Sequence, residues 1–473
     1  MSSTMLRAGA AALLTALLIA APAAASSWHA TPGSAGLGDP FFPKAGNGGY
    51  DVKHYSLDLT YVRATNRLDG EAKLRARATQ SLSSFNLDLR AFMVVSEVEV
   101  NGRDATWSHE AGPDAQELTV TPRHALKRGH KFTVEVEYGG TPEDVVDPDG
   151  SIEGWTTTPD GAFVVNEPQG SPGWYPANDN PRDKATFDIA VTVPEGITAI
   201  ANGRLIKKRT QGGMTTWHWY EDSPMAPYLA TATNGVFEMT VTKVGRIPLY
   251  QAIDPAVKNP ALARERIGLE AEIITLFSDL YGRYPFSSGG GVVDIARANY
   301  NLESQTKSMY DPSQAATASG APAESTVVHE VAHQWFGNAV TLSIWPDIWL
   351  NEGFATWSEW IWDEKQGRAT AAETFDDLYA TFEEWDPAPA AIPGPEQMFH
   401  APPYDRGAMT LQALREKIGD GDFFKLLRRW YKRNRYGNVT TAEFIAAAER
   451  ASGQQLDEFF RVWLFVPAKP TTW

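Results

Sequence analysis

Two histidines, His329 and His333, stand four positions apart in the run HEVAHQWFGN. On an α-helix this spacing puts both imidazoles on one face, about one turn apart, where they could hold one metal ion. Their neighbours are largely apolar, so the helix is expected to be buried, and two buried neutral histidines would otherwise leave ring nitrogens hard to satisfy. Zinc accepts imidazole and carboxylate ligands, and the chain has no cysteine to offer a thiolate. The pattern therefore predicts one zinc ion per chain.

Glu330 lies beside His329 in the sequence but about 100° further around the helix. It is expected to reach beside the metal rather than onto it, which is the place for a general base that acts on water. The alternative is a pair of core histidines on an amphipathic helix, and this short pattern alone does not exclude it.

A catalytic zinc site needs a third protein ligand and an open fourth position. Glu352 is the candidate, nineteen positions after His333 in a second helical pattern, WLNEGFATWSEW. A carboxylate among tryptophan and phenylalanine side chains is costly to bury unless it is paired or binds a metal. Glu359 follows two turns later on the same face and could accept the free N–H of a ligand histidine. The alternative for Glu359 is an ordinary solvated glutamate.

The two runs HEVAHQWFGN and WLNEGFATWSE together resemble the aminopeptidase N family of zinc peptidases. The segment WYPANDNPRDKATFDIAVTVPEG, from Trp174, is similar to the N-terminal domain of that family, and YGRYPF, from Tyr281, is similar to its tight turn after a long helix. The resemblance implies a thermolysin-like catalytic domain and removal of N-terminal residues from peptides. Long relatives carry a further helical domain, and because this chain ends at Trp473 we expect that domain to be absent and the site to be more open.

The same resemblance implies three further site residues. Family members carry a tyrosine in a Tyr-x-Lys-Gly-Ala setting, and YDRGAM supplies Tyr404 here, with Arg406 in place of the lysine. Its phenol would donate to the oxyanion formed during peptide hydrolysis. The family holds the substrate amine with a glutamate in a Gly-x-Met-x-Asn-type segment, of which Glu303 survives in NYNLESQ. A second amine-binding group from the N-terminal domain is matched best by Glu167, with Gln169 as the alternative.

The elements that must position these residues change in character along the chain. From about residue 50 to 244, apolar side chains alternate with polar ones, as in Tyr55, Leu57, Leu59 and Tyr61, which is typical of β-strands. Past Asn259 the apolar spacing becomes helical, with a small sheet near Val292. We expect an α+β multidomain fold: a signal peptide over 1–25, an N-terminal all-β saddle or sandwich domain over 26–240, and a mainly helical, thermolysin-like zinc peptidase domain over 241–473.

The first 25 residues predict export. Arg7 is followed by an apolar run that is short for a membrane span, and then by three alanines at 23–25 that suit cleavage. We read a secretory signal peptide, with an uncleaved anchor as the alternative. The protein is therefore expected to be secreted, without membrane insertion.

Charge argues against one class of partner. The 473 residues carry a formal net charge of −16, which makes nucleic acid a poor partner. Lysine and arginine cluster only in RRWYKRNR, from Arg428 to Arg435, where a helical pattern favours a solvated face.

The residues together predict a secreted zinc aminopeptidase whose substrates are peptides with a free N-terminus. Two alternatives remain open. A secreted zinc endopeptidase would share the metal site but have no use for Glu303 or Glu167. A catalytically inactive, secreted peptide-binding module would have no use for Glu330 or Tyr404.

Overall fold

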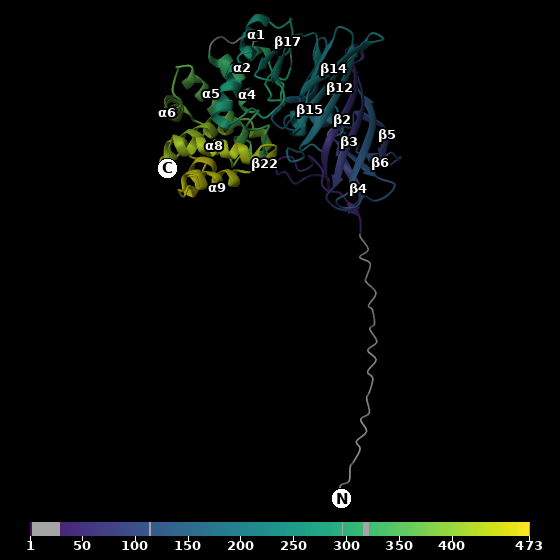
Figure 1. Ribbon diagram of the computed structural model, residues 1–473, viewed down its shortest axis with the longest axis horizontal. Coiled ribbons are helices and arrows are strands. Elements are labelled where there is room, and N and C mark those ends of the chain that lie inside the picture. The colour runs from purple at the N-terminus through teal and green to yellow at the C-terminus, as the bar shows by residue number, and fades with distance from the viewer. Residues whose placement is uncertain (2–28, 113–114, 296, 316–320, 473) are drawn as a thin grey trace.

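The computed structural model describes Met1 and residues 29–112, 115–295, 297–315 and 321–472. The predicted signal peptide falls almost entirely outside these residues. Figure 1 shows a β-rich half on one side and a helical half on the other. No helix in the described ranges is both long enough and apolar enough to cross a membrane.

A seven-stranded sheet with the order β14-β15-β12-β2-β3-β8-β5 organises the first half. Its strand β2 (Tyr50–Val62) buries nearly every second side chain, as the alternating sequence requires. One edge of β2 pairs in parallel with β12 (Ala185–Pro194). The remaining strands are β3 (Arg67–Ala78), β5 (Met93–Val100), β8 (Lys131–Gly140), β14 (Arg204–Gln211) and β15 (Met214–Met225).

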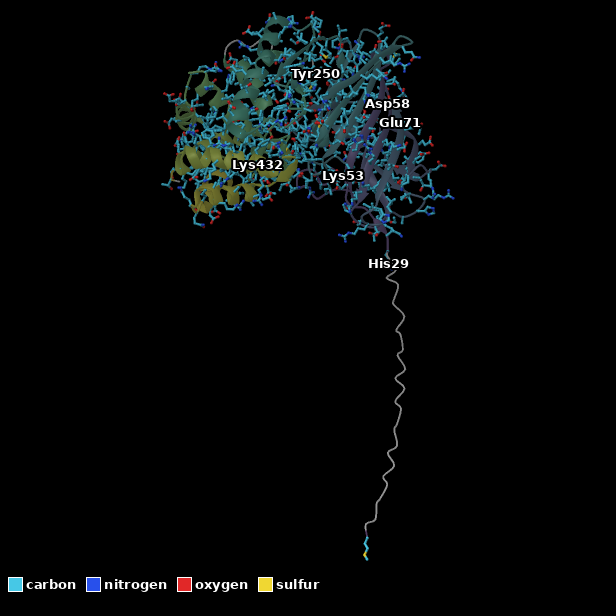
Figure 2. All side chains as sticks on the ribbon, in the orientation of Figure 1. His29, Lys53, Asp58, Glu71, Tyr250 and Lys432 are labelled. Atoms are coloured by element: carbon cyan, nitrogen blue, oxygen red, sulfur yellow. The ribbon has the colours of Figure 1, made fainter. Side chains whose placement is uncertain are left out.

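The exposed face of this sheet carries a row of carboxylates across four strands. In register, Asp58 lies opposite Glu71, Glu71 opposite Glu137, and Glu137 opposite Glu97. Figure 2 labels Asp58 and Glu71, on the β-rich half. Like charges that face each other across strands are destabilising, so this acidic row lowers the stability of the sheet.

Two further sheets complete the β-rich half. One has the order β13-β16-β11-β10-β9 and the other β1-β4-β7-β6. The expected N-terminal β domain is thus confirmed. The strands are β1 (Thr31–Pro32), β4 (Leu82–Asp88), β6 (Thr106–His109), β7 (Glu117–Thr121), β9 (Val145–Val146), β10 (Ile152–Thr157), β11 (Ala162–Val165), β13 (Thr198–Ala201) and β16 (Ala232–Gly235).

The second half has a small sheet, β17-β18-β19-β20, covered by helices, as the sequence predicts. The predicted domain boundary at 240 falls within β17 (Glu238–Val244), which pairs with β18 (Ile247–Ile253) of this second sheet. The other strands are β19 (Gly289–Val293), β20 (Ser308–Tyr310), β21 (Val340–Leu342) and β22 (Gly437–Val439). The helices are α1 (Pro260–Gly268), α2 (Glu270–Tyr281), α3 (Pro312–Ala315), α4 (Ala321–Ala332), α5 (Trp349–Lys365), α6 (Ala371–Thr381), α7 (Gly407–Ile418), α8 (Asp420–Asn434), α9 (Thr441–Ser452) and α10 (Asp457–Phe460).

The two halves share an apolar interface. Trp345 of the helical half lies edge-on to Tyr228 and Phe42 of the β-rich half, with ring centroids 5.2 and 6.2 Å away. Two buried lysines cross this interface in opposite directions. Lys184 donates to the Asn338 carbonyl at 2.8 Å, and Lys307 donates to the carbonyl of Gly203 at 2.8 Å. The halves therefore meet as a packed core and not as loosely linked domains.

Candidate active site

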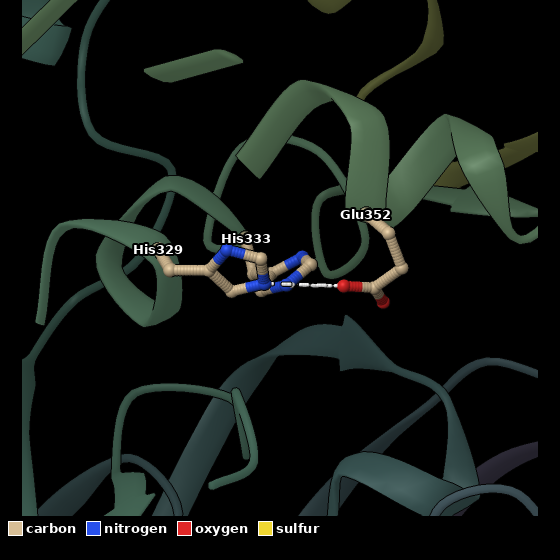
Figure 3. Close-up of side chains that lie close together, drawn as sticks. All are labelled: His329, His333 and Glu352. Carbon is tan, nitrogen blue, oxygen red and sulfur yellow. Dashed lines mark hydrogen bonds and ion pairs between the residues drawn. The ribbon is translucent and has the colours of Figure 1, made fainter. Parts of the chain in front are cut away.

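The two histidines and the third candidate ligand meet between α4 and α5. His329 lies in the last turn of α4, and His333 follows its end, where the His333 N–H still bonds to the His329 carbonyl at 3.2 Å. Glu352 lies in the first turn of α5. Its Oε2 is 3.1 Å from His329 Nε2 and 3.4 Å from His333 Nε2, so all three side chains converge on one point (Figure 3).

Hydrogen bonds at the far side of each imidazole set which nitrogen faces this point. His329 donates from Nδ1 to Glu359 Oε1 at 2.7 Å, and His333 donates from Nδ1 to the carbonyl of Phe336 at 3.1 Å. In neutral rings both Nε2 atoms then present lone pairs to the Glu352 carboxylate, an arrangement that needs a cation between them. Two imidazoles and one carboxylate are a donor set that zinc accepts, so these residues fit the predicted ion.

Electrostatics support the same conclusion. Burial opposes charge on His329, but hydrogen bonds to Glu352 and Glu359 outweigh burial and raise the pKa of the imidazole well above its usual value. Burial likewise opposes ionisation of Glu352, yet the charges of His333 and His329 hold the pKa of this carboxyl at about 2. The buried Glu352 carboxylate therefore needs positive charge beside it, which protonated imidazoles or a bound cation supplies.

A cavity of about 390 Å³ opens in front of this point. Its walls include Glu330, whose pKa burial raises to about 8, and Tyr404, whose ring stacks on that of His329 with centroids 5.9 Å apart. The structure thus brings the predicted base and the predicted oxyanion donor to the cavity that holds the zinc ligands. Their catalytic roles stay predictions.

Tyr404 belongs to a π-helical turn, Pro402–Arg406, that leads into α7. Arg406, which replaces the family's lysine, is fully buried and donates to the carbonyls of Trp463 at 2.9 Å and Trp385 at 2.5 Å. The remaining guanidinium nitrogen, Nη2, donates to the carbonyls of Val462 at 2.9 Å and Val466 at 2.6 Å. The guanidinium therefore ties the turn that carries Tyr404 to the last helical segment of the chain.

The two predicted amine-binding glutamates face the same cavity from different halves of the molecule. Glu303 is 2% exposed and Glu167 is 7% exposed. Ligand atoms of Glu303, Glu330 and His333 lie within 4.8 Å of one another, and Glu167 Oε1 is buried without a hydrogen-bond partner among the described atoms. Burial, together with the neighbouring carboxylates, raises the pKa of both Glu167 and Glu303. Gln169, the alternative to Glu167, instead donates to Asp147 Oδ1 at 3.0 Å and lines a separate cavity.

Two residues that position Glu303 were not identified from the sequence, although both stand in the run HEVAHQWFGN. Gln334 donates from Nε2 to the main-chain carbonyl of Glu303 at 3.1 Å, and Asn338 donates from Nδ2 to the same oxygen at 2.7 Å. Gln334 also accepts from the N–H of Thr306 at 2.9 Å. Both are amides in an apolar run, and that contrast is the signal that could have identified them. They fix the backbone of Glu303 to the zinc-binding segment.

Comparisons with known proteins agree with this geometry. The model of the Peptidase family M1 domain matches residues 297–463, and the model of the Peptidase M1 N-terminal domain matches residues 51–229. The chain is similar to the M1 zinc metallopeptidase from Deinococcus radiodurans, with 30% sequence identity, a TM-score of 0.82, and coverage of 92% of this chain and 98% of that one. A mutant of the Deinococcus protein bound to a Tyr-Ser-Ala substrate gives a TM-score of 0.81 at 30% identity, with coverage of 92% and 98%.

Curated relatives are longer. Aminopeptidase M1 of Arabidopsis thaliana is 28% identical over 327 residues, which cover 64% of this chain and 36% of that protein. Glutamyl aminopeptidase of Bos taurus is 27% identical over 324 residues, which cover 64% of this chain and 34% of that protein. The matched region thus spans about a third of the length of these curated relatives. With its β-rich first half, its helical second half and its His-His-Glu zinc site, the chain belongs to peptidase family M1, a family of zinc metallopeptidases.

Proposed function

We propose that the protein is an aminopeptidase that removes residues from peptides with a free N-terminus. The observation that carries this proposal is the pair Glu303 and Glu167, buried in the same cavity as the zinc ligands. The described lining of the cavity holds six carboxylates and neither lysine nor arginine. Such a cavity suits a substrate ammonium group, and an acylated amine would leave both glutamates without a charged partner.

The geometry supports a distinct task for each residue. Glu303 and Glu167 accept hydrogen bonds from the substrate ammonium group and so fix the first peptide bond beside Glu330. When bound, zinc supplies Lewis acidity, which lowers the pKa of water and polarises a carbonyl group. Glu330 takes a proton from the attacking water and delivers it to the leaving amine. Tyr404 donates its phenolic proton to the developing oxyanion.

Two substrates separate this proposal from an endopeptidase. Leucine p-nitroanilide should be hydrolysed, whereas its N-acetyl derivative should react at least about a hundredfold more slowly because the buried glutamates would lack their cation. Equal rates on both compounds would overturn the aminopeptidase proposal. The variant Glu303→Gln should lose most of this discrimination.

The variant Glu330→Gln tests whether the protein is an enzyme at all. Its zinc content should equal that of the wild type because Glu330 is not one of the three ligands, while its hydrolytic rate should fall to background. A wild type that holds zinc but hydrolyses neither anilide nor any member of a peptide library would favour the inactive binding module.

We also propose that the protein is secreted, with residues 1–25 as a cleaved signal peptide. The support is the Arg7 start, the apolar run and the three alanines before Ser26. N-terminal sequencing of protein recovered from culture medium tests this. An intact N-terminus on cell-associated protein would contradict it.

A further inference from the structure

A second cavity, of about 660 Å³, lies between α8 and α9 and shares no lining residue with the zinc site. Its apolar wall is built from both helices. The two large members, Leu426 and Trp430, are 1% and 5% exposed, so they form a floor and do not protrude. The apolar residues of this basic groove are Leu426, Trp430, Ala446, Ala447 and Ala451.

Four cations surround that floor: Arg429, Lys432 and Arg433 of α8, and Arg450 of α9. All four are exposed. Within the described part of the chain, no ion pair or side-chain hydrogen bond engages any of them, although acidic residues outnumber basic ones by 58 to 42. By contrast, the neighbouring Arg428 donates to the carbonyl of Leu280 at 3.4 Å. The unpaired cations of these two helices thus gather around one hollow.

The helix dipole explains only part of this arrangement. Cations in the last turn of a helix stabilise it by about 0.3–1 kcal/mol each, which accounts for a basic C-terminal turn in α8 and in α9 separately. The helix dipole does not explain why the cations of both helices border the same cavity. The acidic residue in the lining, Glu443, is already engaged, because its carboxylate accepts from Thr440 N at 2.9 Å and from Thr440 Oγ1 at 3.2 Å.

One side-chain donor in the groove wall lacks a partner. Asn434 lines the groove, and its Nδ2 is buried without a hydrogen-bond partner among the described atoms. An apolar floor and a cationic rim are the features of a site for an anionic chain with apolar side chains.

We propose that the basic groove binds an acidic peptide segment in which carboxylate and apolar side chains alternate. The carboxylates would pair with the four cations while the apolar side chains cover the floor. The rest of the surface would steer such a segment to this place, because the acidic row on the sheet repels it. Figure 2 shows Lys432 on the helical half and Asp58 and Glu71 of the acidic row on the β-rich half.

A membrane fits the groove less well. Docking on a bilayer needs large apolar side chains that protrude between the cations. The exposed large apolar residues of the described chain all lie outside the groove lining: Met1, Val94, Trp107, Val146, Ile206, Val236, Val241 and Phe465. A nucleic acid would gain from the cations but leave the apolar floor uncovered.

Fluorescence anisotropy with a labelled peptide of alternating glutamate and leucine tests the proposal. The peptide is N-acetylated and C-amidated, so it offers no free amine to the zinc site. We expect saturable binding to the zinc-loaded protein that weakens as salt rises, and at least about tenfold weaker binding by the triple variant Lys432→Gln, Arg433→Gln and Arg450→Gln. The variant Arg428→Gln, on the same helix but outside the groove, should bind like the wild type.

Four results would overturn the proposal. They are equal affinity of the triple variant and the wild type, equal affinity for a peptide with glutamine in place of glutamate, binding of phosphatidylglycerol vesicles in place of the peptide, and tighter binding of a single-stranded oligonucleotide than of the peptide. Unchanged hydrolysis of leucine p-nitroanilide and an unchanged circular dichroism spectrum would show that the triple variant is folded.

Discussion

Replacing Lys184 by methionine should change how the stability of the protein depends on pH. Lys184 is 8% exposed, and its Nζ donates to the carbonyl of Asn338 at 2.8 Å and to Thr341 Oγ1 at 2.6 Å. Burial lowers its pKa to about 7. The pKa of a lysine in an unfolded chain is about 10.4, so between these two pKa values the unfolded chain binds a proton that the folded chain does not.

The sign of the effect follows from that difference. Where the unfolded state binds more protons, the free energy of unfolding rises with pH. This gain is lost as the pH falls from the unfolded pKa to the folded pKa. Between about pH 7 and about pH 9 the wild type should therefore gain about 2 kcal/mol relative to Lys184→Met, which lacks the titrating group. Lys307 titrates similarly but is present in both proteins, so its contribution cancels.

Urea unfolding followed by tryptophan fluorescence, with zinc saturating at both pH values, measures this difference. The variant Lys258→Met removes an exposed lysine and should follow the wild type at both pH values. If the free energy of unfolding of the wild type minus that of Lys184→Met stays constant between the two pH values, Lys184 keeps an ordinary pKa in the folded protein, and the reasoning is refuted.

Three further changes test the site and the sheet. Glu359→Gln should weaken zinc binding by about 10–100-fold in competition with a chelator because His329 loses its charged acceptor, and unchanged affinity would remove Glu359 from the support of the ligand. Tyr404→Phe should lower kcat by about 10²–10³ while zinc content stays constant, and a full rate would refute its oxyanion role. Glu137→Gln should raise the free energy of unfolding by about 0.2–1 kcal/mol for each of its facing partners, Glu71 and Glu97, and a lower melting temperature would contradict the destabilising effect of the acidic row.

The sequence carries the zinc site clearly because its signals are local. His329 and His333 share a helix face, and a carboxylate buried among aromatic residues at Glu352 has few explanations other than a metal. The alternation in β2 likewise predicts a half-buried strand. These patterns extend over a few residues, so no knowledge of the fold is needed to read them.

Other features depend on contacts between distant residues. Lys184 and Asn338 are 154 positions apart, so no local pattern reveals that they meet. The helical spacing after Asn259 likewise does not reveal that two helices, α1 and α2, follow there and meet at Leu269. Serine and proline in the stretch from Asp311 to Ala323 favour a loop, yet its described parts contain α3 and the start of α4, in keeping with the high helix propensity of alanine.

Lys184 and Lys307, the buried lysines that bond across the two halves, also affect how the protein can be engineered. Each half provides an ammonium group for carbonyl oxygens of the other, so neither half carries all the hydrogen-bond partners that its own buried surface needs. A helical half produced alone would keep all three zinc ligands, yet the Asn338 carbonyl would lose its ammonium donor close to the segment that holds Glu303. A chimaera that exchanges the β-rich half must therefore bring its own lysine at the position of Lys184, and a gene fusion that ignores this would keep the zinc ligands and misplace Glu303.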